Sequence, residues 1–220
     1  LNANVSYRLP HRMKDGYGLQ EKFIYEFKDL GVNLIITVDN GVACKDQIDL
    51  AKSFGIDTIV TDHHTIPVIF PDSAYAVIHP KQEGCSYPFK DLAGAGVAFK
   101  LSKALLRSFE IPDGEKFIDS LFDLASLGTV ADCTSLTSEN RFIVKKGLQK
   151  LQNTEWRGLA LLKKSAGIDV VSPNDAHVIG FRIGPRINAA GRMGSPYFAL
   201  QALLDEGGKA EMLVNELERL

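Results

Sequence analysis

Carboxylate and imidazole side chains follow two short apolar runs in the first third of the chain. Leu34–Val38 leads directly into Asp39, and Thr58–Thr61 leads into the Asp-His-His run Asp62–His64. Oxygen and nitrogen donors of this kind suit Mn²⁺, Mg²⁺ or Zn²⁺ better than Ca²⁺, which prefers oxygen ligands alone. Two adjacent histidines point in different directions, so one can bind a metal while its neighbour faces a substrate. A single histidine is more often a structural residue, but this pattern after an apolar run favours a functional site.

A third acid, Asp132, follows the run of small and apolar residues Ser126–Ala131. It could be a further metal ligand, or it could cap the N-terminus of a helix that begins after it. Spacing along the chain leaves both interpretations open.

The elements that must position these side chains alternate between strand-like and helical patterns. Strands are expected at residues 5–7, 34–38, 58–61 and 74–78, with helices at 19–30 and 44–54 between them. Residues 34–38 are almost wholly apolar, which is typical of a parallel strand buried on both faces. The alternation predicts an α/β fold with a parallel sheet flanked by helices. Ligands bind beyond the carboxyl ends of such strands, so Asp39 and Asp62–His64 are expected to converge on one crevice.

The second half of the chain is expected to be mainly helical. Helices are predicted at residues 93–109, 115–127, 139–152, 156–166, 197–204 and 209–220, with an irregular segment rich in Gly, Arg and Asn at 173–196. We divide the chain into an α/β metal-binding part, residues 1–135, and a helical extension, residues 136–220, within one domain. The chain begins beside a predicted strand and stops in a predicted helix, so we expect a fragment of a longer protein.

Composition narrows the class of protein. No run approaches the roughly 20 apolar residues of a membrane span, and no signal-peptide pattern opens the chain, so no membrane partner is expected. The cysteines, Cys44, Cys85 and Cys133, form no CxxC pair, which indicates reduced thiols in a cytoplasmic protein. The net charge is −2, but basic residues gather in 1–14 and 157–192. Local basic patches suit a chain that holds both phosphates and metal-binding carboxylates.

Several sequence blocks, taken in order, match one family. They are Tyr7–Arg12, Gly16–Leu19, Val38–Gly41, Thr61–His64, Gly94–Lys100, Gly128–Asp132 and Gly184–Arg192. With these blocks the chain resembles the DHH phosphoesterase superfamily, and within it the RecJ-type exonucleases that act on single-stranded DNA. The resemblance covers essentially the whole chain, and the Gly184–Arg192 block is its RecJ-type part.

The resemblance implies a site with two Mn²⁺ or Mg²⁺ ions. It makes Asp39 the carboxylate that bridges both ions, with His63 and Asp132 as ligands of one of them. It makes Asp62 a residue that orients the adjacent chemistry, and His64 the histidine that faces the scissile phosphate. These five residues are the expected catalytic set, and Asp132 is thereby a ligand.

The resemblance also implies contacts to the nucleic acid. Arg12 is expected to bind a phosphate of the DNA, because guanidinium groups match phosphate geometry. His64 is expected to contact the DNA at the scissile phosphate. Arg186, Asn188 and Arg192 are expected to grip the strand from a glycine-rich loop. For the aromatic residues Tyr17 and Phe181 we favour core packing over stacking on bases. The Gly94–Lys100 block is expected to bring a helix close to the sheet and to have no catalytic role.

Two parts of the family pattern are absent from these 220 residues. One is the first motif, an aspartate-rich strand end expected before Val5, which supplies the other half of the two-metal site. The other is a C-terminal second domain with a glycine-rich motif. We therefore expect this chain alone to bind metal weakly and to have little or no nuclease activity.

The function that follows is 5′-to-3′ exonuclease hydrolysis of single-stranded DNA in repair and recombination. A single-strand-binding protein or a helicase would be its partners. One alternative is a phosphodiesterase that acts on short oligonucleotides or cyclic dinucleotides, against which the Gly184–Arg192 block argues. The other is a scaffold without catalysis, which would have no need for an intact set of site residues: Asp39, His63, His64 and Asp132.

Overall fold

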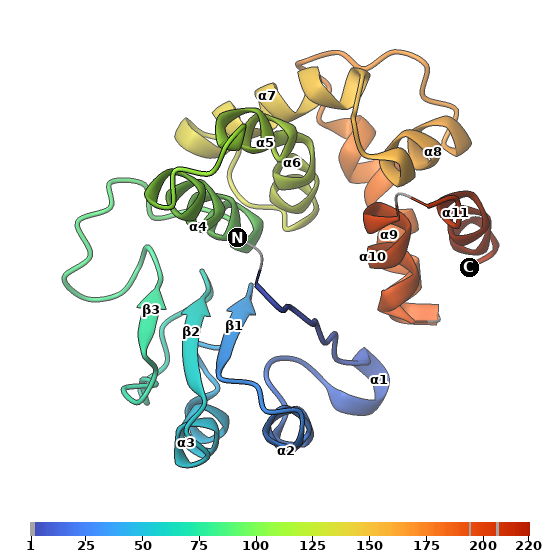
Figure 1. Ribbon diagram of the computed structural model, residues 1–220. Coiled ribbons are helices and arrows are strands. Elements are labelled where there is room, and N and C mark those ends of the chain that lie inside the picture. Colours follow the sequence, from blue (N-terminus) through green and yellow to red (C-terminus); the bar gives the residue numbers. More distant parts are fainter. Residues whose placement is uncertain (1–2, 194, 206) are drawn as a thin grey trace.

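A small parallel sheet positions the first half of the chain. The structure is a computed structural model and describes residues 3–193, 195–205 and 207–220. Its strands are β1 (Leu34–Val38), β2 (Asp57–Thr61) and β3 (Ala76–Ile78), in the order β1-β2-β3. All pairs are parallel, and Val38 lies opposite Thr61, so β1 and β2 end at the same level. The carboxyl ends of the strands point toward the helices drawn in green (Figure 1), and the predicted α/β fold is confirmed.

Two helices pack against one face of the sheet. α2 (Glu21–Asp29) and α3 (Lys45–Ser53) contact one another, and α3 also contacts β2. Their buried side chains form a cluster with the sheet through Ile24, Ile35, Ala51 and Ile56. Both helices end where glycine was expected to end them, because Gly31 and Gly55 have φ of +68° and +75°, which side chains disfavour.

The prediction that β1 is buried on both faces is wrong. Ile35 and Thr37 are buried, but the alternate residues Leu34, Ile36 and Val38 are 46%, 45% and 53% exposed. Burial alternates along β1 because the cluster formed with α2 and α3 covers only one face of the strand. An apolar run therefore indicated the strand correctly and its burial incorrectly.

The predicted strand at residues 5–7 is also wrong. This segment joins no sheet in the described part of the chain and lies against α10 (Pro196–Leu204) instead. The ring of Tyr7 stacks on Tyr197, and the Leu9 N–H donates to the Tyr197 hydroxyl at 3.0 Å. A tyrosine from far along the chain holds this segment in place of a neighbouring strand.

The second half is helical, as predicted. Its helices include α4 (Gly94–Ser108), α5 (Gly114–Ser120), α6 (Phe122–Ala131), α7 (Ser138–Gln152), α8 (Arg157–Ser165) and α11 (Ala210–Arg219). One helix was expected over 115–127, but α5 and α6 are separate and meet at Leu121. Two contacts explain the break. The Ser120 carbonyl accepts a hydrogen bond from the Trp156 indole, and the Asp123 carboxylate accepts one from the Leu124 N–H as α6 begins.

The segment 173–196, predicted to be irregular, is largely helical. A π-helix, η1 (Val178–Ile183), runs into α9 (Gly184–Met193). Glycine lowers helix propensity by about 1 kcal/mol relative to alanine, but burial outweighs this cost. Ile179 and Ile183 are fully buried, and a side chain on Gly180 would contact Val130 of α6.

The helical core joins the two parts of the chain. Leu127 of α6, Leu148 of α7 and Ile179 of η1 belong to one buried cluster. α6 and α7 can approach closely because Gly147 has no side chain. A Cβ at this position would lie 2.2 Å from the Ser126 Cβ. The division at residue 135 stays a prediction. Among the described residues, no helix is both long and apolar enough to cross a membrane. All three cysteines are free thiols.

Candidate metal centre

Asp39 occupies a strained turn at the end of β1. Its φ is +62°, in the left-handed region, and its N–H donates to the Thr61 carbonyl at 3.0 Å. Two residues later the same turn requires glycine, since Gly41 has φ +111° and a Cβ there would lie 2.6 Å from Thr37 Oγ1. Non-glycine residues held in this region cost about 1–3 kcal/mol and cluster at functional sites. The turn bends the chain directly after β1 and directs the Asp39 carboxylate toward the end of β2.

The Asp39 carboxylate lies against the N-terminus of α4. A Cβ on Gly94 would lie 1.9 Å from Asp39 Oδ1, so no larger residue fits at Gly94 with the carboxylate in place. The predicted close approach of this helix to the sheet is confirmed, and its first turn favours a negative charge. Gly94 therefore contributes directly to the site, which sequence reasoning missed.

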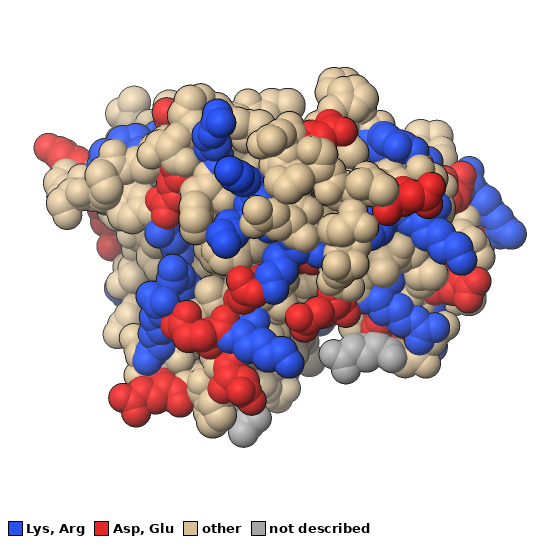
Figure 2. Space-filling model, turned by 90° about the horizontal axis from the view of Figure 1, so that it is seen from above, with Lys and Arg blue, Asp and Glu red and all other residues tan. Residues whose placement is uncertain are grey.

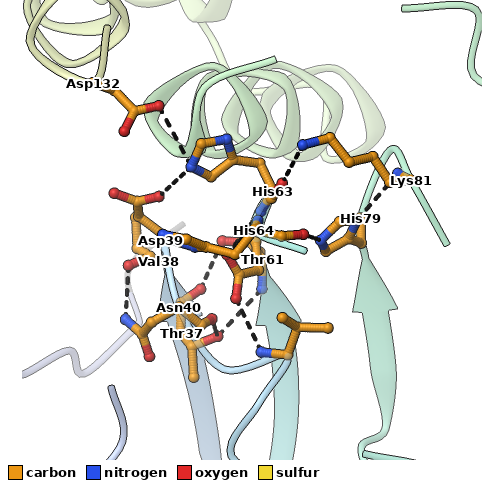
Figure 3. A network of polar contacts seen from close by, with 12 residues as sticks. Thr37, Val38, Asp39, Asn40, Thr61, His63, His64, His79, Lys81 and Asp132 are labelled. Carbon is orange, nitrogen blue, oxygen red and sulfur yellow. Dashed lines mark hydrogen bonds and ion pairs between the residues drawn. The ribbon is translucent and has the colours of Figure 1, made fainter. Parts of the chain in front are cut away.

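His63 lies between two carboxylates. Its Nε2 is 3.1 Å from Asp39 Oδ1 and 3.5 Å from Asp132 Oδ2 (Figure 3). This nitrogen is buried and has no well-aligned hydrogen bond in the described part of the chain. The Asp39 carboxylate raises the pKa of His63, and this effect exceeds the lowering by burial. Burial likewise raises the pKa of Asp132, although His63 opposes it.

A divalent cation fits this arrangement. A buried imidazole nitrogen without a hydrogen bond, directed at two carboxylates, is a donor set that such an ion would complete. Asp39, His63 and His64 also offer ligand atoms that all lie within 4.8 Å of one another. Asp132 follows α6 as its C-terminal cap, with its N–H bound to the Gly128 carbonyl. The alternative that Asp132 caps a helix N-terminus is therefore wrong.

Asp62 is fully occupied by hydrogen bonds. Its Oδ2 accepts from the Val42 N–H at 3.0 Å, and its Oδ1 accepts from the backbone N–H groups of His63 and His64. Oδ1 also lies 2.6 Å from His64 Nδ1. Burial raises the pKa of Asp62, but these hydrogen bonds outweigh it and leave the pKa lowered. Asp62 thus holds the His64 ring through Nδ1 and leaves Nε2 available, which fits the predicted orienting role.

Two residues that follow β3 also belong to this region and were missed. His79 is buried and donates from Nε2 to the His64 carbonyl at 2.9 Å, while Lys81 Nζ donates to the His63 carbonyl at 2.8 Å. Burial lowers the pKa of His79. His79 follows an apolar strand as Asp39 and Asp62 do, so the same pattern could have identified it.

A cavity of about 400 Å³ opens beside the two histidines. Its lining consists of His63, His64, Lys81, Asp91, Asp132, Cys133, Thr134 and Ser135. The His64 side chain is 59% exposed, whereas that of His63 is 10% exposed. The two neighbouring histidines thus differ as expected, with one held among carboxylates and the other open to solvent.

The residues predicted to bind nucleic acid are divided. Arg12 lies on the short helix α1 (Arg12–Asp15), which contacts α9, and its guanidinium lies 5.0 Å from the centre of the Tyr17 ring. Asn188 and Arg192 are exposed and lie one turn apart on α9, which is a helix and not the expected loop. Arg186 differs, because its guanidinium binds Glu218 at 2.6 Å and the Arg182 carbonyl at 2.5 Å.

The prediction of core packing for Tyr17 and Phe181 is wrong. Each is 71% exposed. Phe181 stacks on His177, with ring centres 4.4 Å apart, because η1 directs Ile179 and Ile183 inward and Phe181 outward. Basic and acidic side chains are interspersed over the face of the molecule shown in Figure 2. The described residues of this face therefore form no uniform basic patch, and the exposed rings of Tyr17 and Phe181 are surface features of a different kind.

Comparison with known proteins agrees with this geometry. The family described as DHH family, N-terminal domain, matches residues 1–129. The single-stranded-DNA-specific exonuclease RecJ of Bacillus subtilis (strain 168) is 44% identical, over 100% of this chain and 27% of its own length. RecJ of Escherichia coli (strain K12) is 38% identical, over 99% of this chain and 39% of its own length. The chain thus spans between about a quarter and two fifths of these relatives.

Solved structures extend the similarity to the fold. A crystal structure of exonuclease RecJ bound to manganese superposes with a TM-score of 0.83 and 37% identity, covering 96% of this chain and 51% of that one. RecJ in complex with Mn²⁺ from Thermus thermophilus gives a TM-score of 0.77 and 35% identity, covering 90% of this chain and 29% of that one. The family match covers more than half of the sequence and contains Asp39 and the Asp-His-His turn. The chain belongs to the DHH family.

Proposed function

We propose that this chain carries the DHH part of a metal-dependent phosphodiesterase that hydrolyses single-stranded DNA from the 5′ end, in repair and recombination. The convergence of Asp39 and Asp132 on the buried Nε2 of His63 carries the proposal. The relatives that bear the name single-stranded-DNA-specific exonuclease support the choice of substrate.

Asp39, His63 and Asp132 would hold a Mn²⁺ or Mg²⁺ ion, with Asp39 placed to bridge to a second. Divalent ions about 3.5–4 Å apart lower the pKa of bound water and offset the charge that develops on phosphoryl oxygens. The chain's own part is to fix the ligands. β1 and β2 end at one level, and α4 confines the Asp39 carboxylate from one side.

His64 would contact the scissile phosphate. Asp62 holds its Nδ1 at 2.6 Å, so Nε2 is the atom left to meet a phosphoryl oxygen from the open side. With protons on both ring nitrogens, Nε2 can donate to that oxygen while Asp62 keeps the ring in place. A donor fixed in this way needs no rearrangement when charge develops in the transition state. Lys81 adds a positive charge in the same cavity.

The strand would lie across α1 and α9. Arg12 and Arg192 offer guanidinium groups for phosphates, Asn188 offers an amide, and Tyr17 offers an exposed ring on which a base can stack. Arg186 is bound to Glu218, so we assign it the role of joining α9 to α11 beneath this surface.

The same proposal extends to the cellular setting. The free thiols of Cys44, Cys85 and Cys133 suit the reducing cytoplasm. A single-strand-binding protein and a helicase would be the partners, because both act on the single strands that such an enzyme digests.

A substrate panel tests the proposal. The longest natural polypeptide that contains this chain is assayed in Mn²⁺ with 5′-phosphorylated single-stranded DNA, the matching duplex, the matching RNA and a cyclic dinucleotide. We expect preferential release of nucleotides from the 5′ end of single-stranded DNA. Preference for the cyclic dinucleotide, or no hydrolysis at all by a folded, manganese-loaded protein, would refute it.

A further inference from the structure

Three consecutive residues of the Asp-His-His turn are each held from the segment that leaves β3, residues 78–81. The contacts are Asp62 N–H to the Ile78 carbonyl at 3.2 Å, Lys81 Nζ to the His63 carbonyl at 2.8 Å and His79 Nε2 to the His64 carbonyl at 2.9 Å. Figure 3 shows the last two contacts converging on the turn from the side opposite Asp39. The backbone of the turn is therefore clamped along its whole length.

The protonation of the His79 ring follows from its neighbours. Its Nδ1 accepts a hydrogen bond from the Lys81 N–H at 3.1 Å, so the ring proton lies on Nε2, which donates to the His64 carbonyl. His79 is only 2% exposed, so water does not compete for either nitrogen. A buried side chain with both ring nitrogens in use has one available orientation.

The clamp acts where Asp62 does not. Asp62 holds the His64 ring and the amide groups of the turn, whereas the carbonyl groups of His63 and His64 depend on Lys81 and His79. Rotation of these peptide groups would turn both imidazoles away from their targets. Groups that orient metal-binding and substrate-binding side chains in this way govern affinity and rate without touching either ligand.

We propose that His79 and Lys81 are positioning residues of the metal centre. They fix the turn so that His63 Nε2 stays directed at Asp39 and Asp132 and His64 Nε2 stays in the cavity. This inference rests on the proposed function for its activity readout only. Its other two readouts, Mn²⁺ affinity and amide exchange at residues 63 and 64, do not require that the protein cut DNA.

The test compares His79→Leu, which removes the donor, with His79→Gln, whose amide can again reach the His64 carbonyl. Thr58→Val is the matched control, since Thr58 is buried on β2 and its hydroxyl makes no hydrogen bond in the described part of the chain. All are made in the longest natural polypeptide that contains this chain. We expect His79→Leu to lower Mn²⁺ affinity and kcat by about 10–100-fold, with a smaller change in KM for DNA. Exchange at residues 63 and 64 should accelerate, and His79→Gln should recover most of each loss.

Three results would overturn the proposal. One is a folded His79→Leu variant with wild-type Mn²⁺ affinity and exchange. Another is a folded His79→Gln variant that is no better than His79→Leu. If His79→Leu fails to fold, Lys81→Met decides instead, because Lys81 is exposed and its loss leaves the core intact. Unchanged exchange at residue 64, whose N–H belongs to the same peptide group as the His63 carbonyl, would then refute the proposal. Wild-type protein that binds Mn²⁺ and cuts no DNA would refute the proposed function and leave the clamp to be judged by affinity and exchange.

Discussion

Substitution of Gly94 by alanine should damage the metal centre by displacing Asp39. The added Cβ would lie 1.9 Å from Asp39 Oδ1, whereas ordinary contacts begin at 3.4 Å, so the carboxylate must move by 3.4 − 1.9 = 1.5 Å. A misplacement of about 1 Å can cost 100-fold in rate. The Asp39 side chain is 48% exposed, so its carboxylate can rotate into solvent. The added Cβ would also lie 2.6 Å from Asp39 Cβ, so the backbone at Asp39 or at the start of α4 must shift as well.

Manganese titration by electron paramagnetic resonance measures the loss. We expect Gly94→Ala to weaken Mn²⁺ binding by about 10–100-fold. Stability to urea should fall by about 1–3 kcal/mol, because the overlap with Asp39 Cβ forces a backbone shift. Gly191→Ala is the matched control, since Gly191 is a helical glycine and no described residue lies within 4 Å of an added Cβ there, apart from its own stretch of helix. Wild-type Mn²⁺ affinity in Gly94→Ala would refute the placement of Asp39 against α4.

Further predictions concern the same site and the surface proposed to bind the DNA strand. Asp39→Ala in the longest natural polypeptide should abolish cleavage, and near-wild-type turnover in Mn²⁺ would contradict its role as a ligand. The 220-residue chain alone should bind Mn²⁺ weakly and cut little or no single-stranded DNA, whereas two tight sites in a titration would contradict the expected half-site. Mn²⁺ affinity should rise as the pH increases through the raised pKa of His63, because the ion must displace the proton that Asp39 stabilises. If calorimetry shows no pH dependence of the affinity, His63 is excluded as a ligand. Arg192→Gln should weaken DNA binding and reduce its salt dependence by about one unit of slope. Arg186→Gln should instead lower stability to urea by about 1 kcal/mol or less, and the reverse pattern would exchange the roles of the two arginines.

The candidate site could be predicted in large part because its signals are local. An apolar run followed by Asp39, and another followed by Asp62–His64, indicate two strand ends. One helix between them makes the strands neighbours. Asp132 is different, because its place beside His63 depends on how α6 packs. Only the family resemblance indicated its role as a ligand.

The wrong predictions share one cause. Residues 5–7 join no sheet in the described part of the chain, and Tyr197 contacts this segment at Tyr7 and Leu9. The helix expected over 115–127 breaks because the Ser120 carbonyl accepts a hydrogen bond from Trp156. The segment 173–196 is helical because Ile179 and Ile183 are buried. In each case a partner distant in the sequence overrides the local preference of the chain.

Local patterns in the amino-acid sequence were therefore sufficient to predict three features. They are the alternation of strands and helices, the ends of α2 and α3 at glycines, and the gathering of aspartates and histidines at one edge of the sheet. Periodicity and backbone preference are properties of neighbouring residues, so they can be read from the chain alone. Three features came from the packing of distant segments. Among the described residues His63 Nε2 lies between two carboxylates without a hydrogen bond, Arg186 is bound to Glu218, and Phe181 faces solvent. Burial and pairing depend on which distant segments pack together, and no local pattern contains that information.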